Sequence, residues 1–196
     1  MRWPRIDNRY RPFFFLLVIG FVTEVVSFIL IKGFHRQNGF VVNIYILIEW
    51  IMIAWQFHVW GLLKQRANLF WTLVGLVSLV WVGEYFVFGH LSDFSPYFRC
   101  LYFFLIVLMS INNINFMITH DNRSLIRNPK FLICIGFLIY FVFMILDYWA
   151  YQVSRYNKSS LSTTFVFLMA YINAGTNSIY AIAFLLIPAR VKFTLK

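Results

Sequence analysis

The chain has 196 residues, of which 61% are hydrophobic and only 12% charged. A soluble domain usually carries about 25% charged residues, and one of this length has too little interior to bury so much apolar surface. The excess of 17 Lys and Arg over 7 Asp and Glu could suggest nucleic-acid binding, but the basic residues lie between apolar runs instead of in one patch. Composition therefore excludes a soluble fold and a nucleic-acid partner, and it indicates a lipid bilayer as the solvent.

Six apolar segments are long enough to cross the hydrocarbon core as helices, which takes about 20 residues each. They cover residues 13–31, 40–63, 69–89, 100–119, 131–151 and 162–188. The connectors are short and polar. The sequence therefore predicts an all-α, polytopic transmembrane bundle in which residues 1–196 form a single transmembrane domain. The first segment is too long for the core of a cleavable signal peptide, so we expect it to remain as an anchor.

The distribution of Lys and Arg predicts the orientation. Most of them fall in the terminal segments and in the second and fourth connectors: Arg2, Arg5, Arg9, Arg11, Lys64, Arg66, Arg123, Arg127, Lys130, Arg190, Lys192 and Lys196. The opposite side carries fewer: Lys32, Arg36, Arg99, Arg155 and Lys158. Because basic flanks remain on the cytoplasmic side, both termini are expected in the cytoplasm.

Polar residues recur at similar places in successive segments. The first, third and fifth segments each carry one acid past their midpoint: Glu24, Glu84 and Asp147. The second, fourth and sixth segments carry asparagines such as Asn43. Three copies of a helical hairpin would give this pattern, and parallel repeats occur in transporters. The alternative is that any bundle needs some polar contacts and that these fell at similar heights by chance.

The acids inside the segments are the strongest functional signal. Glu24, Glu49, Glu84 and Asp147 all lie within predicted spans. A charge at the bilayer centre costs at least about 2.5–3.5 kcal/mol, and no Lys or Arg lies deep in a predicted span to pair with these acids. We therefore expect the four carboxyls to be protonated, hydrated, hydrogen-bonded or bound to a cation.

Helical spacing places several polar residues on common faces. Tyr45 and Glu49 share a face of the second segment, and Asn173, Asn177 and Tyr180 share one of the sixth. Together with Glu24, Asn43, Glu84, Asn112 and Asp147, they form the predicted ligand- or ion-binding set. We expect this set to line a cavity that opens toward the outer face of the membrane, with the acids in its outer half and the amides nearer the inner side. The alternatives are that the asparagines only join helices, that Glu24 and Glu49 are protonated carboxyls bonded to neighbouring polar groups, and that Glu84 and Asp147 reach the headgroups.

Several kinds of chemistry find no motif in the sequence. It contains no P-loop, no G-x-S-x-G nucleophile motif and no His pair with the spacing of zinc ligands. His90 and Asp93 lie close together in a connector, but chance proximity explains them better than a metal site. We expect no cofactor, no metal and no disulfide between Cys100 and Cys134, which fall at opposite ends of their spans.

Two motifs resemble a known group of proteins. Asn43-x-Tyr45-x-x-x-Glu49 in the second segment and Asn173-x-x-x-Asn177-x-x-Tyr180-Ala181-x-x-Phe184 in the sixth are similar to small multi-helix membrane proteins of Bacteroidota. The resemblance covers a minor part of the chain, and the group has no assigned activity. It implies a bacterial inner membrane and directs attention to Glu49 and Asn177.

Three functions fit these observations. An acidic and amide-lined cavity favours a small transporter or channel-like protein for protons, cations or an amphipathic solute. A membrane sensor, effector or assembly partner of another protein, or a homo-oligomer, would use the same polar residues as a ligand site or structural core. An intramembrane enzyme acting on lipid would use two carboxyls as acid and base, although an enzyme is the less favoured reading.

Overall fold

A computed structural model describes residues 7–62, 64–87, 89, 96–120, 124–157 and 161–187. Six helices in these ranges have the length and composition to cross a membrane, as the sequence predicts. The basic residues Arg2, Arg5, Arg123, Lys158, Arg190, Lys192 and Lys196, and the pair His90 and Asp93, lie outside the described residues. The orientation of the termini and the hairpin repeat stay predictions.

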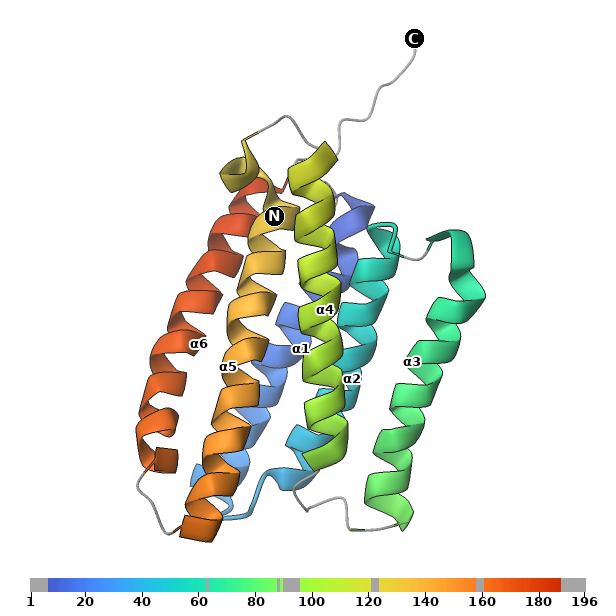
Figure 1. The fold of residues 1–196 in the computed structure, drawn as a ribbon. Coiled ribbons are helices and arrows are strands. Elements are labelled where there is room, and N and C mark those ends of the chain that lie inside the picture. The colour runs from blue at the N-terminus through green and yellow to red at the C-terminus, as the bar shows by residue number, and fades with distance from the viewer. Residues whose placement is uncertain are drawn as a thin grey trace. The chain divides into compact units, whose positions relative to one another are not determined.

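The chain divides into two compact units, the first holding the described residues up to Tyr102 and the second those from Phe103 onward. Four long helices supply the first unit: α1 (Arg11–Phe28), α2 (Gly39–Val59), α3 (Ala67–Val82) and the start of α4 (Pro96–His120). Within it, α1 and α2 lie side by side (Figure 1), and α3 contacts α2. The prediction of one transmembrane domain stays a prediction.

Short helical elements extend or precede the long helices of the first unit. The π-helical turns η3 (Ile29–Gly33) and η5 (Gly83–Val87) continue α1 and α3, and the 3-10 turns η2 (Asn8–Tyr10) and η4 (Lys64–Arg66) precede the same two helices. π-Helical turns are rare and often occur at functional sites. Glu84, one of the predicted site acids, lies in η5.

Large side chains form the core of the first unit, and a glutamine joins two of its helices. Phe13, Trp50 and Phe57 are fully buried. Gln56 of α2 accepts a hydrogen bond from the Phe13 backbone N–H at 2.8 Å and donates one to the Arg9 carbonyl at 2.6 Å. The first N–H groups of a helix have no partner within it, so this buried amide closes the start of α1.

The second unit contains the rest of α4, the turn η6 (Leu125–Arg127), α5 (Pro129–Asn157) and α6 (Leu161–Leu186). Helices α5 and α6 lie side by side (Figure 1). Gly136 of α5 permits this approach, because a Cβ there would overlap the ring of Tyr180 on α6. Large apolar side chains such as Phe167 and Leu185 are exposed on α6, as lipid-facing residues are in a membrane protein.

Candidate functional site

Glu49 is the buried acid around which a polar site forms in the first unit. It lies in the middle of α2, and its side chain is only 8% exposed. One carboxyl oxygen accepts a hydrogen bond from the Tyr45 hydroxyl at 3.1 Å, and the other accepts one from the Tyr102 hydroxyl at 3.0 Å. Tyr45 precedes Glu49 by one turn of the same helix, whereas Tyr102 comes from α4. The carboxyl is therefore held from two helices.

A guanidinium lies beside this carboxyl. Nη2 of Arg99 donates a hydrogen bond to Oδ1 of Asn43 at 2.9 Å, and the Arg99 charge interacts electrostatically with Glu49. The Asn43 backbone carbonyl also accepts a hydrogen bond from the Trp81 indole N–H at 3.0 Å. We call Asn43, Tyr45, Glu49, Arg99 and Tyr102 the Glu49 cluster. No Lys or Arg lies deep in a predicted span, but Arg99, near the start of α4, still lies close enough to Glu49 to interact with it.

Helix α1 contributes a close approach to the cluster. A Cβ added to Gly20 would lie 3.2 Å from the Tyr45 hydroxyl oxygen, which is tighter than most Cβ contacts in proteins. A glycine therefore gives the phenol the space to lie between α1 and α2 while its hydroxyl faces Glu49. This packing fixes the position of the donor without adding a polar group from α1.

Glu84 positions the helix that supplies Arg99 and Tyr102. Its two carboxyl oxygens accept hydrogen bonds from the backbone N–H groups of Tyr97 at 3.1 Å and Phe98 at 2.9 Å. These N–H groups lie in the first turn of α4, where intrahelical acceptors are missing and the helix dipole favours negative charge. The structure thus gives Glu84 a capping contact with α4.

The other two predicted acids are in different environments. Glu24 is exposed on α1, and Asp147 is half-buried on α5 in the second unit. Among the described residues, neither carboxyl has an observed hydrogen bond. The structure therefore brings Asn43, Tyr45 and Glu49 of the predicted set together, but it does not add Glu24 to them.

The predicted amides of the second unit lie on helix surfaces. Asn112 is exposed on α4. Asn173 and Asn177 are exposed on α6, and the Asn177 amide donates to Oδ1 of Asn173 at 3.0 Å. Tyr180 instead packs against α5, where its ring meets Phe137 edge-to-face at a centroid distance of 5.7 Å. These residues form no described cluster comparable to that around Glu49.

The remaining candidates for metal or redox chemistry lie apart. Within the described ranges, no group of three His, Cys, Asp or Glu side chains is arranged to hold a metal ion. Cys100 is exposed and Cys134 is buried, and both are free thiols. The chemistry that the Glu49 cluster can perform is therefore that of a carboxyl, two phenols, an amide and a guanidinium.

Sequence reasoning missed Arg99 and Tyr102 as members of the site. The predicted fourth span begins at residue 100, which leaves Arg99 in a connector and Tyr102 at the interface. In the structure, α4 begins at Pro96, so both residues lie inside the helix. Proline is common at the first helical position, so Pro96 was a signal for the earlier start.

In the part of the chain that the structure describes, six helices have the length and composition of membrane spans, and the first unit holds the Glu49 cluster. This composition is that of a multi-pass membrane protein. No known protein family, curated protein or solved structure matches the chain.

Proposed function

We propose that this protein moves protons across its membrane, with Glu49 as the group that takes up and releases the proton. The observation that supports the proposal is the burial of this carboxyl in a span, where it accepts hydrogen bonds from two phenols. Buried acids inside spans mark proton relays and ion pathways. The resemblance to Bacteroidota membrane proteins would place this activity in a bacterial inner membrane.

The surroundings of Glu49 suit a proton better than a larger solute. The carboxyl is enclosed by side chains that already bond to it, and a proton needs no cavity of its own. The hydroxyls of Tyr45 and Tyr102 can each donate and accept a hydrogen bond, so they can pass a proton toward or away from the carboxyl. The Arg99 charge offsets the negative charge that remains when the proton leaves.

Proton flux into liposomes tests the proposal. Purified protein is reconstituted with a pH-sensitive dye inside, and a potassium diffusion potential drives proton entry. We expect flux above that of protein-free liposomes, its loss in Glu49→Gln and a reduced rate in Tyr102→Phe. Glu24→Gln is the matched control, because it removes an acid from a span at an exposed position. Flux equal to that of empty liposomes, or equal losses in both Gln variants, would refute the proposal.

An assembly role is the second candidate, and the exposed amides of α6 favour it. Asn173 and Asn177 are exposed on α6, a helix that is otherwise apolar enough to span the membrane. Amides in lipid gain from bonding to another helix. Cross-linking in native membranes would test this role: Asn173→Leu with Asn177→Leu should abolish a cross-linked species, and an unchanged pattern would count against it.

A further inference from the structure

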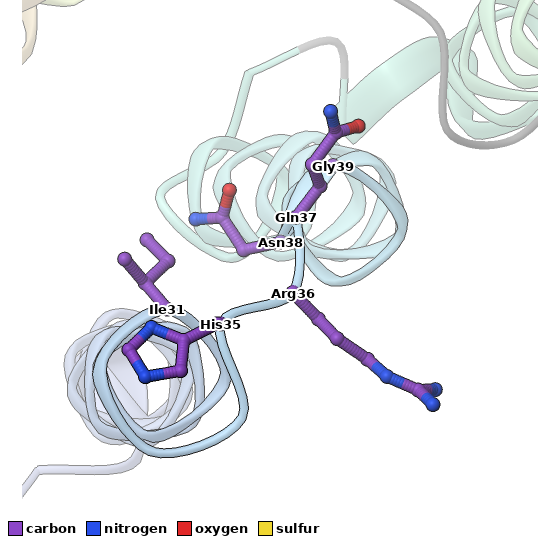
Figure 2. A pocket seen from close by; sticks show the side chains of 6 residues that line it. All are labelled: Ile31, His35, Arg36, Gln37, Asn38 and Gly39. Carbon is purple, nitrogen blue, oxygen red and sulfur yellow. The ribbon is translucent and has the colours of Figure 1, made fainter.

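The connector between α1 and α2 contains a pocket of about 560 Å³. Its lining residues are Ile31, His35, Arg36, Gln37, Asn38 and Gly39 (Figure 2). The pocket lies where two candidate spans end, since the first ends at Gly33 and the second begins at Gly39. In a bilayer, this position is at the level of the lipid headgroups.

The lining combines an apolar side chain with polar ones. Figure 2 shows the side chains of Ile31, His35 and Asn38 gathered on one side of the connector, while Arg36 and Gln37 extend away from it in different directions. Ile31 belongs to the helical turn η3, whereas His35 and Asn38 belong to the loop. A lipid presents the same combination of chemistry where its glycerol backbone meets its headgroup.

The connector carries only positive charge. Lys32 and Arg36 are cationic, and no acid occurs between Ile29 and Gly39. The side chains of Lys32, His35 and Arg36 are all exposed. The Asn38 side chain makes no capping hydrogen bond to α2, so its amide can serve as a donor in the pocket.

We propose that this pocket binds the phosphate group of an anionic lipid headgroup. Arg36 and Lys32 attract the phosphate, the His35 and Asn38 side chains donate hydrogen bonds to its oxygens, and Ile31 contacts the apolar part of the lipid. Basic residues near a membrane surface attract anionic lipid over a distance in this way, so Arg36 contributes by its charge although its side chain extends away from Ile31, His35 and Asn38. The site is separate from the Glu49 cluster and does not depend on proton transport.

Lipid binding to the full-length protein in nanodiscs tests the proposal. The probe is a fluorescent phosphatidylglycerol, with phosphatidylcholine as the background lipid and a fluorescent phosphatidylcholine as the reference probe. We expect Arg36→Gln to weaken phosphatidylglycerol binding about fivefold, the loss for one basic residue near a membrane surface. A combined His35→Gln and Asn38→Leu variant should weaken it further, because the hydrogen-bond donors are then also lost.

Two controls make the result decisive. Arg127→Gln removes an exposed basic residue from another connector, so it controls for general surface charge. If Arg127→Gln weakens phosphatidylglycerol binding as much as Arg36→Gln does, the proposal is overturned. Equal binding of fluorescent phosphatidylglycerol and fluorescent phosphatidylcholine would also overturn it. Inorganic phosphate is titrated separately. If it displaces the lipid probe at low concentration, the pocket is a site for free phosphate and the lipid assignment is overturned.

Discussion

Replacing Tyr102 by Phe should destabilise the helical bundle more than replacing Tyr45 by Phe, although both changes remove one hydroxyl from the same carboxyl. The Tyr45 bond joins residues one turn apart in α2, whereas the Tyr102 bond joins α4 to α2. Membrane helices persist when they separate from one another. The bond within α2 can therefore survive in the unfolded state, but the bond between helices cannot.

The magnitudes follow from this difference. Interhelical hydrogen bonds in membranes contribute about 0.6 kcal/mol on average and up to about 1.7. Because the acceptor is a carboxyl oxygen and Tyr102 is only 1% exposed, we expect its loss to cost about 1 to 1.7 kcal/mol of unfolding free energy. Tyr45→Phe should cost at most about 0.5 kcal/mol, the value of a pair one turn apart on a helix.

Reversible unfolding in mixed lipid–detergent micelles, followed by tryptophan fluorescence, measures these values. Tyr171→Phe serves as the control, because this tyrosine is 77% exposed and should show no change. In a double-mutant cycle, Tyr102→Phe should cost about 0.5 kcal/mol less in a Glu49→Gln background, since the amide offers only one acceptor. Equal costs for the two tyrosines, or strict additivity with Glu49→Gln, would refute this account of the cluster.

Three further predictions test the packing around the site. Gly136→Ala should destabilise the α5–α6 pair by about 1–3 kcal/mol because the new methyl group meets the Tyr180 ring. The control variant Gly175→Ala adds its methyl group in open space and should not destabilise the pair. Equal unfolding curves for the two variants would contradict the contact. Gln56→Leu should remove both of its hydrogen bonds and lower the local stability of the first turn of α1 by about 1–3 kcal/mol, measured as faster amide exchange there. Unchanged exchange would contradict the capping role. Glu84→Gln should weaken the start of α4 by about 0.5–2 kcal/mol, measured as faster exchange confined to its first turn.

The spans could be predicted from the sequence because hydropathy and length alone decide them. All six predicted segments coincide with observed helices, and differences are confined to their ends. The fourth helix shows why the ends matter. Moving its start from residue 100 to Pro96 transfers Arg99 from a connector into the site. Charged residues at the end of a span lower the apparent hydropathy, so an apolar window ends before the helix does.

The candidate site was only partly predictable. Tyr45 and Glu49 are one turn apart on α2, so helical spacing alone could group them. Asn43 is at helical spacing from neither of them, and it joins the cluster through its hydrogen bond with Arg99 of α4. Tyr102 comes from a distant part of the chain, and no pattern within one helix pairs it with Glu49. The contact depends on how α2 and α4 pack, which the sequence of either helix does not specify.

The contrast between Glu49 and Glu24 has a further physical reason. Hydropathy gives the depth of a residue in the membrane, but its direction depends on the rotation of the helix about its axis. Helix α1 is apolar around most of its circumference, so its sequence does not indicate which face packs inward. The structure turns Gly20 toward Tyr45 and leaves Glu24 exposed. Glu24 lies one turn after Gly20 on the same side of α1, so rotation of the helix does not separate them. Packing at one level of a helix side therefore does not bury the acid at the next level, and helical spacing alone does not predict which level is buried.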